Sequence, residues 1–375
     1  MSKILYFCNC DLRMKNGHGL MIRAHHRMLT SLYPDKVITV MMPDEPCYYD
    51  YVCFNHASQI EKFFAVLTGY SPDLSLKTIG ALLTIIEKED VKTVFIESSM
   101  FGNLVKKIKK FDPSINVVTY FTDIEADLLN QEMKNCNTKR RAVIRRLIQN
   151  EYKTVKFADK KFVLNKRDAE IYYNYYGQQP DAIIPIIIDK ANFEDGSNMH
   201  TAYSKLRLLF VGGDFWPNVA GIRWFVESVI PKISSPCELT IVGLGMEKYR
   251  DELESKSSCV HVVGTVDDLK PYFVNSDLFV APIKDGGGMK VKTAEALSYG
   301  KTFIGMEESL IGYWEFVPQE LKGDGVIQCI DESEMANCID SYYGKTFSRC
   351  RKDIKDFIDA LCGYEENLER FKKLF

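Results

Sequence analysis

The sequence has no apolar run approaching the roughly 20 residues that a membrane-spanning helix requires. Its first residues, 1–8, resemble a buried strand and are too short for the apolar core of a secretion signal. The 11 cysteines include no Cys-x-x-Cys pair and show no zinc-like spacing, and Cys8 and Cys10 are the closest two. An Asp-x-Asp pair that could hold a divalent metal is also missing. These absences favour a protein of the reducing cytoplasm with no bound metal.

An excess of positive charge is missing as well. The formal net charge is −3, which argues against a nucleic-acid partner. Lys and Arg exceed Asp and Glu by 27 to 24 in residues 1–195 (+3), and fall short by 21 to 27 in the rest (−6). With 375 residues, 46% of them hydrophobic and 26% charged, the chain has the size and composition of two globular domains.

Short apolar segments alternate with helical patterns along the whole chain, which is typical of α/β proteins with parallel sheets. Strands are expected at residues 4–8, 37–41, 94–96, 117–121, 161–164, 182–188, 206–211, 239–242, 260–263 and 277–281. Residues 195–200 have linker composition. We therefore expect two domains, 1–195 and 196–375, with a helical segment at 347–375 that can cross back to the first domain.

A glycine-rich loop joins the strand expected at 277–281 to a helical pattern at 292–299. The glycines at 286–288 let a ligand approach the backbone, and amide groups at a helix start bind anions. Lys290 and Lys292 add positive charge, and Glu295 lies one turn into the helix, within reach of a pair of sugar hydroxyls. The stretch predicts a diphosphate site, and the simpler alternative is a strand-to-helix turn with solvated lysines.

The run Gly-Gly-Gly-Met-Lys-Val-Lys-Thr-Ala-Glu-Ala-Leu-Ser-Tyr-Gly-Lys (286–301) resembles the donor-binding segment of bacterial glycosyltransferases of family 4. The resemblance implies the GT-B fold, in which two Rossmann-like domains face each other across a cleft. It also implies that Glu295 holds the ribose of a nucleotide. Gly287 stands eight positions before Glu295, where many members have a first glutamate, and the chain resembles a branch with a glycine loop and lysine instead.

The same resemblance implies that the second domain binds a nucleotide sugar, most plausibly a UDP-sugar, and that the chain needs no other cofactor. It places the base near Gly243 and Val266 and the phosphates near Gly213, with lysines in place of a metal. The expected donor-binding residues are Gly17, Gly19, Gly212, Gly213, Gly243, Val266, Gly287, Gly288, Met289, Lys290, Lys292 and Glu295.

The first domain offers candidates for the acceptor side of the reaction. The loop containing His18 lacks the third glycine of a dinucleotide fingerprint, so a nicotinamide cofactor is not supported. Asp123 and Glu125 follow the strand at 117–121, where related enzymes often have Phe-His-Asn-x-Glu. Their carboxylates are suited to orient or deprotonate a hydroxyl, or else they cap the next helix. The expected catalytic residues are His18, Asp123, Glu125 and, for the leaving diphosphate, Lys290.

Two basic stretches, 106–110 and 139–146, fall on amphipathic helical patterns. Such charges usually form a solvated face. They also suit peripheral contact with the anionic inner leaflet of the cytoplasmic membrane.

These features lead us to expect a glycosyltransferase of the hexosyltransferase type, retaining and metal-independent. It would move a sugar from a nucleotide donor to a hydroxyl of a glycan, lipid-linked or protein acceptor. Two alternatives stay open. One is a nucleotide-sugar 2-epimerase of the same fold, and the other is a silent sugar-nucleotide-binding protein, which Gly287 in place of a glutamate suggests.

Overall fold

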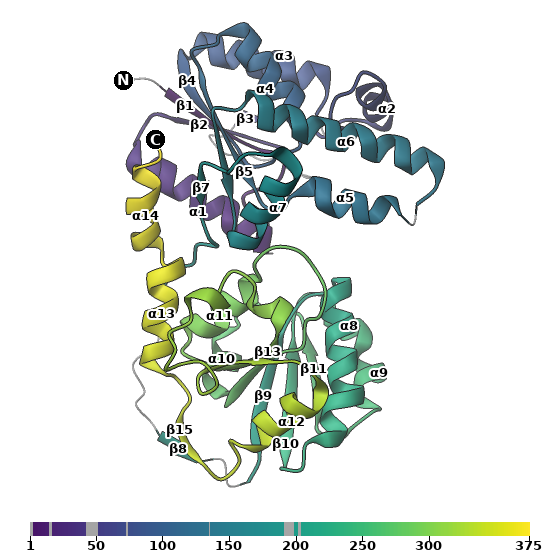
Figure 1. The fold of residues 1–375 in the computed structure, drawn as a ribbon, viewed down its shortest axis with the longest axis vertical. Coiled ribbons are helices and arrows are strands. Elements are labelled where there is room, and N and C mark those ends of the chain that lie inside the picture. The colour runs from purple at the N-terminus through teal and green to yellow at the C-terminus, as the bar shows by residue number, and fades with distance from the viewer. Residues whose placement is uncertain are drawn as a thin grey trace. The chain divides into compact units, whose positions relative to one another are not determined.

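The computed structural model describes residues 3–14, 17–42, 52–72, 74–134, 136–190, 199–201 and 204–375. The chain divides into two compact units (Figure 1). Unit 1 comprises Met1–Pro185 together with Leu368–Phe375, and unit 2 comprises Ile186–Asn367. The division expected at residue 195 lies outside the described residues.

Unit 1 alternates strands and helices, as the apolar pattern predicted. Its elements are β1 (Lys3–Cys8), α1 (Gly17–Leu32), β2 (Val37–Met41), β3 (Val52–Cys53), α2 (Gln59–Leu67), α3 (Leu76–Lys88), β4 (Val91–Ile96), α4 (Gly102–Phe111), β5 (Asn116–Phe121), α5 (Glu125–Met133), α6 (Thr138–Phe157), β6 (Lys160–Val163), α7 (Lys166–Tyr176) and β7 (Ala182–Ile183). The end of α14 (Tyr364–Lys372) also belongs to this unit.

The strands of unit 1 form one sheet in the order β3-β2-β1-β4-β5-β6-β7, with parallel neighbours. Successive strand residues point to opposite faces. Leu5 and Phe7 of β1 pack with α3 and α4 on one face. On the other face, His25 of α1 contacts Tyr120 at 4.5 Å and stacks on Phe371 at 5.8 Å between ring centroids. Both faces are therefore covered, which explains the continuous apolar strands.

The strand expected at 182–188 is shorter than predicted, since β7 covers only Ala182–Ile183. Pro185 has no backbone N–H and cannot continue a ladder. Beyond it, Ile188 makes an isolated bridge with Gly363 in unit 2.

Unit 2 repeats the α/β pattern. Its strands are β8 (Met199–Thr201), β9 (Leu206–Val211), β10 (Cys237–Val242), β11 (Val260–Gly264), β12 (Leu278–Ala281), β13 (Thr302–Met306), β14 (Val326–Cys329) and β15 (Thr346–Ser348). Its helices are α8 (Trp216–Trp224), α9 (Arg250–Glu254), α10 (Lys270–Asn275), α11 (Val291–Ser298), α12 (Glu332–Asp340) and α13 (Lys352–Cys362), with short helical turns η1 (Phe225–Val229), η2 (Ile230–Lys232), η3 (Met246–Tyr249), η4 (Glu307–Leu310) and η5 (Trp314–Phe316).

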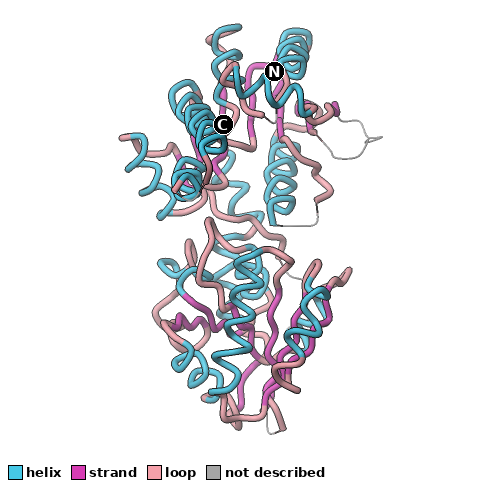
Figure 2. The backbone as a smooth tube through the Cα atoms, turned by 90° about the vertical axis from the view of Figure 1, so that its right-hand side faces the viewer, coloured by secondary structure: helices cyan, strands magenta, loops and turns pink. Residues whose placement is uncertain are grey.

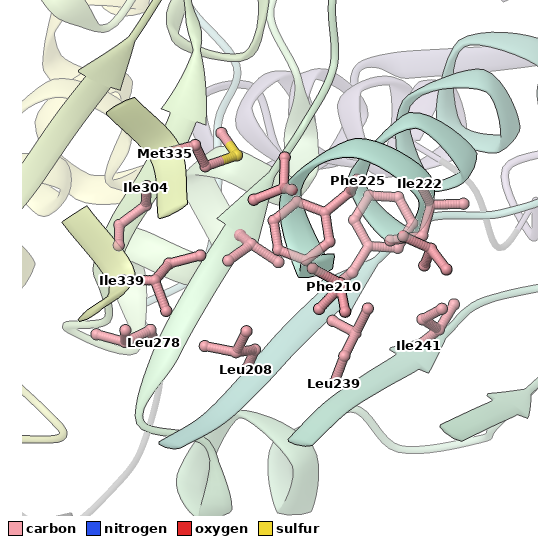
Figure 3. Close-up of a cluster of buried hydrophobic side chains, with 14 of the residues drawn as sticks. Leu208, Phe210, Ile222, Phe225, Leu239, Ile241, Leu278, Ile304, Met335 and Ile339 are labelled. Atoms are coloured by element: carbon pink, nitrogen blue, oxygen red, sulfur yellow. The ribbon is translucent and has the colours of Figure 1, made fainter. Parts of the chain in front are cut away.

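Six parallel strands of unit 2 form a second sheet in the order β11-β10-β9-β12-β13-β14. Figure 3 shows its apolar core, in which side chains of β9, β10, β12 and β13 meet those of α8, η1 and α12. Phe210, Ile222 and Phe225 lie at the centre of this core and are fully buried. Figure 2 shows the strands of each unit running side by side between helices. Both units thus have the Rossmann-like architecture that the sequence predicted.

The helical segment expected at 347–375 begins later than predicted. Residues 346–348 form β15, which pairs antiparallel with β8 in a separate two-stranded sheet. Helix starts only at Lys352. The alternation of polar and apolar residues before Arg349 is too short to distinguish strand from helix.

Candidate active site

In the sheet of unit 2, the strand order reverses its direction between β9 and β12. β10 and β11 extend from one side of β9, whereas β12, β13 and β14 extend from the other. Ligands of open α/β sheets bind beyond the carboxyl ends of the strands at such a point. The loops that follow β9 and β12, which the sequence analysis proposed for the donor site, therefore lie at the edge where ligands of such sheets bind.

The loop after β12 is built from glycines because its backbone adopts conformations that side chains disfavour. Gly286 has φ of 131° and Gly288 has φ of 60°. Gly287 is half-buried, and Met289 is buried beside it. Helix α11 then begins at Val291, with Lys290 at its N-cap and no side-chain cap. The side chain at the N-cap thus accepts from none of the first amide groups of α11, and a helix start of this kind can bind an anion.

Lys290 holds this loop together. Its ammonium group lies 2.7 Å from the Glu308 carboxylate and donates to the carbonyl oxygens of Gly287 and Gly288 at 3.1 and 3.0 Å. Its own carbonyl accepts a 2.9 Å hydrogen bond from the buried Tyr313 hydroxyl. The positive charge of Lys290 is therefore compensated within the protein.

Lys292 lies on the first turn of α11 and contacts different groups. Its ammonium donates to the side-chain oxygen of Asn218 on α8 and sits 5.5 Å from the centre of the Phe210 ring. Burial lowers the pKa of Lys292 to about 7, and repulsion from Lys290 acts in the same direction. A lysine in this state gains from any anion placed beside it.

Glu295 follows Lys292 by one turn and is half-buried. Burial raises the pKa of this carboxyl to about 7, and the nearby Lys292 charge opposes that rise. Lys292 and Glu295 both have pKa values shifted strongly by burial, a pattern common at functional sites.

The glycines after β9 and β10 allow two loops to touch backbone to backbone. The Gly212 N–H donates to the Val242 carbonyl at 2.9 Å. A Cβ at Gly243, whose φ is 152°, would collide with the Gly212 carbonyl. Asn218 donates to the Gly213 carbonyl at 2.9 Å while it accepts from Lys292, so it joins the β9 loop to α11.

Val266 lies farther along the same edge, in the loop after β11, and is half-buried. Its loop approaches that of β10, where the Gly243 N–H donates to the Gly264 carbonyl at 2.8 Å. Phe215 and Leu244 are exposed on the neighbouring loops, and Trp216 is exposed at the start of α8. The rim of this edge thus offers apolar surface beside the charged groups.

In unit 1, several ionisable groups gather at the carboxyl edge of β1, β4 and β5. The hydrogen bond with Cys10 raises the pKa of His18, and the charges of Glu97 and Asp123 act in the same direction. Gly17 and Gly19 open α1 on either side of His18, and a Cβ at Gly19 would collide with the Met14 carbonyl.

Glu97 is buried and accepts from the Tyr6 hydroxyl at 2.8 Å, and its carboxylate lies 2.9 Å from Nδ1 of His25. His25 and Glu97 therefore form a buried polar pair.

Asp123 and Glu125 flank the start of α5, but the cap of this helix is supplied elsewhere. The N-cap position is Ile124, with no side-chain cap of its own. The buried Glu151 carboxylate accepts from the backbone N–H groups of Glu125 and Ala126 at 3.1 and 3.0 Å. Glu151 performs the capping that the sequence considered for Asp123.

Three residues of the donor region were not found from the sequence: Asn218, Glu308 and Tyr313. Asn218 directly follows Trp216-Pro217, and the proline indicated a helix start close to the expected donor site. Glu308 and Tyr313 are ordinary in their local context, and only the folded chain brings them to Lys290.

Two general features bear on the chemistry. In the described part of the chain, no group of three or more His, Cys, Asp or Glu side chains is arranged to hold a metal ion. Within the same ranges, no helix combines the length and apolarity needed to cross a bilayer.

Comparison with known proteins bears on unit 2 and on the fold. Residues 205–344, within unit 2, match the family described as "Glycosyl transferases group 1". No curated protein matches the chain.

Three solved structures illustrate the similarity of fold. Sucrose-phosphate synthase from Thermosynechococcus elongatus has a TM-score of 0.69 at 14% identity and covers 100% of this chain and 98% of its own. The lipopolysaccharide outer core galactosyltransferase WaaB has a TM-score of 0.67 at 10% identity and covers 99% and 98%. HepE from Anabaena in complex with UDP-glucose has a TM-score of 0.65 at 10% identity and covers 100% of both chains.

The fold is therefore GT-B, with two Rossmann-like domains, and the resemblance to GT-B glycosyltransferases is confirmed. The family match includes the glycine loop, Lys290, Lys292 and Glu295, which first suggested it.

Proposed function

We propose that this protein transfers a sugar from a nucleotide sugar, with a UDP-sugar as the expected donor, to a hydroxyl group of a glycan, lipid-linked or protein acceptor. The observation that carries the proposal is the pair Lys292 and Glu295 on the first turns of α11. Both are half-buried with pKa values of about 7, at the point of the sheet where ligands of this architecture bind. The family match over residues 205–344 supports it.

In this reaction the bond between the anomeric carbon and a diphosphate oxygen breaks, and a bond from the acceptor oxygen to that carbon forms. The acceptor proton passes to a basic group, and negative charge grows on the departing diphosphate. Stabilisation of that charge is usually the largest catalytic contribution available. Amide groups at the start of α11 and a lysine ammonium supply it in our account, so we propose a metal-independent enzyme.

Of the two lysines, we assign the leaving diphosphate to Lys292 rather than to Lys290. The charge of Lys290 is already compensated by Glu308 and two carbonyl oxygens. Lys292 contacts a neutral amide oxygen and has its pKa lowered by burial, so a diphosphate stabilises its charged form more. Lys290 then orders the glycine loop, and Glu295 accepts hydrogen bonds from ribose hydroxyls.

Unit 1 supplies the acceptor-side groups in this proposal. Asp123 is the base that orients or accepts the acceptor proton, with Glu125 nearby at the start of α5. His18 is better suited to donate a hydrogen bond than to accept a proton, because Cys10, Glu97 and Asp123 raise its pKa. Retention of the anomeric configuration, transfer of a hexose and a cytoplasmic location complete the proposal.

The proposal is tested by incubating the protein with UDP-glucose, UDP-galactose and UDP-N-acetylglucosamine, each with a panel of glycan, lipid-linked and peptide acceptors. Acceptor-dependent release of UDP together with a glycosylated product supports it. Epimerisation of the donor without acceptor, or binding of UDP without turnover across the panel, contradicts it in favour of the epimerase or the silent binding protein.

A further inference from the structure

The large apolar side chains of helix α2 face solvent instead of packing against the core. Ile60, Phe63, Phe64 and Leu67 have i, i+3, i+4, i+7 spacing and so share one side. On most surface helices such a stripe packs against the core. Here the four side chains are 71%, 62%, 57% and 59% exposed, and the buried residue of the helix is Ala65. We call these four side chains the α2 stripe.

The α2 stripe belongs to an anchored helix. Ser58 and Glu61 form a capping box at the start of α2, with the Ser58 N–H donating to Glu61 at 2.8 Å. Just beyond its end, the Gly69 carbonyl accepts from Asn150 at 3.1 Å and Lys153 at 3.4 Å, both on α6 (Figure 1). The capping box thus defines the start of α2, and the hydrogen bonds of Gly69 tie its end to α6.

Positive charge collects beside this helix. Lys153, which contacts Gly69, lies close enough to Lys106 and Arg146 for their repulsion to add to the burial that lowers its pKa. Lys77 also lies close enough to attract the carboxylate of Glu61. Within the described residues, Glu61 is the acidic group of α2 itself, and it is engaged in the capping box. Exposed apolar side chains are therefore flanked by ammonium and guanidinium groups.

We propose that the α2 stripe and the basic residues beside it form a docking surface for an anionic lipid bilayer. Apolar side chains on one face of a helix bury themselves at the boundary between headgroups and acyl chains. Lys and Arg beside them attract the phosphate groups of acidic lipids. The charge of the neighbouring residues selects a bilayer over a purely apolar protein groove. The sequence had suggested membrane contact through basic helices alone, and the structure adds the apolar element. The inference concerns where the protein works and goes beyond the reaction proposed above.

The test is sedimentation of the full-length protein with vesicles of phosphatidylcholine alone and vesicles containing about one-third phosphatidylglycerol. We expect binding to the anionic vesicles that weakens with salt, and at least tenfold weaker binding to the neutral ones. A Phe63→Trp variant adds a reporter, because the native tryptophans, Trp216, Trp224 and Trp314, all lie in unit 2. Its added fluorescence should be quenched by brominated acyl chains.

Matched variants separate the two parts of the surface. Phe63→Ser combined with Phe64→Ser should weaken vesicle binding at least tenfold, whereas Ile330→Ser, at a residue 78% exposed in unit 2, should not change it. The double variant Lys106→Ala with Arg146→Ala should weaken vesicle binding by about fivefold for each charge that is removed. Lys270→Ala with Lys345→Ala, at exposed lysines of unit 2, serves as the control for charge.

The serine variants should keep their melting temperature and their affinity for UDP, because the replaced side chains are exposed and lie in the other unit from the donor site. Absence of vesicle binding at low salt would overturn the proposal. So would unchanged binding in the serine variants, or unquenched fluorescence of Phe63→Trp. A dimer that dissociates in the serine variants would instead assign the stripe to a second copy of the chain. If the lipid proposal fails, the proposed sugar transfer still stands, because it is measured separately with soluble acceptors.

Discussion

The ammonium group of Lys290 lies 2.7 Å from the carboxylate of Glu308, and this ion pair fixes the glycine loop at the start of α11. The ammonium group of the neighbouring Lys292 donates instead to the neutral amide oxygen of Asn218. Two lysines that look equivalent in the sequence therefore have different surroundings. This difference gives each of them a separate expected phenotype.

Replacement of Lys292 by Met should lower kcat by about 100- to 1,000-fold, because charge on the diphosphate grows only as the glycosidic bond breaks. Lys290→Met should instead raise the donor KM, since it loosens the loop that binds the diphosphate. Steady-state kinetics with the donor found in the acceptor screen measure both. The reverse assignment, with kcat lost in Lys290→Met alone, contradicts our interpretation, and near-normal values in both variants remove the diphosphate site altogether.

The Lys290–Glu308 pair should also be visible as a coupling energy. Both side chains are largely buried, so removal of either partner leaves the other charge uncompensated. We expect Lys290→Met and Glu308→Gln each to destabilise the fold by about 1–2 kcal/mol, and the double variant to cost less than their sum. Denaturant unfolding of the four proteins gives the cycle, and strict additivity would show that the pair contributes nothing to the loop.

The affinity for UDP should fall as the pH rises above about 7. The pKa of Lys292 is about 7, and an anionic diphosphate raises it in the complex, so binding takes up a proton in this range. The affinity is therefore full below pH 7 and decreases above it until the pKa of the bound form is reached. Glu295 titrates in the same region, so the informative comparison is with Lys292→Arg, which stays charged. A profile that is identical in wild type and Lys292→Arg between pH 6 and 9 would be evidence against this role.

Glu295→Gln should stabilise the free protein at pH 8 by about 1 kcal/mol. Burial raises the pKa of Glu295 from its usual value to about 7 in the folded state. The folded protein therefore holds the proton more tightly than the unfolded chain, and stability from this group is lost as the pH rises to 7 and beyond. The gain should vanish at about pH 3.5, below the ordinary pKa of a glutamic acid, where both states are largely protonated. A gain of the same size at both pH values would point to packing instead of charge.

Turnover should persist in excess EDTA, because the lysine and the helix amides provide the charge that a divalent metal provides elsewhere. The assay compares rates with EDTA, with added Mg²⁺ and with added Mn²⁺. Activity that disappears with the chelator and returns with a metal would require a different account of the leaving group.

Much of the secondary structure of unit 2 could be predicted, because apolar runs, glycines and helical spacing indicate the same sequence of strand, loop and helix. The strand at Leu278–Ala281, the glycine loop and helix α11 follow one another as the pattern indicated. The strand at 182–188 was overpredicted because apolar periodicity outweighed Pro185, which interrupts the ladder. The helix expected from residue 347 missed the pairing of β15 with β8, a contact between segments far apart in the chain.

Local patterns in the sequence suggested candidate residues for the site, but they could not predict the contacts that these residues make. Glu308 is 18 residues from Lys290, and Asn218 is 74 residues from Lys292, so no local pattern connects them. Burial of Lys292 could not be inferred either, because a lysine near a glycine loop is usually solvated. For α2, the periodicity of the sequence contains no information on whether the apolar face points inward or outward.

The most direct test of the account is calorimetric titration of UDP into the wild-type protein and into Glu295→Ala at neutral pH. Loss of a hydrogen bond to a charged group should weaken binding by about 1.5–3 kcal/mol, which is about 10- to 150-fold in Kd. We predict that wild type binds UDP and that folded Glu295→Ala binds it weaker by that factor. Equal affinity in the two proteins, or no binding by either, would contradict the assignment of the nucleotide site to α11.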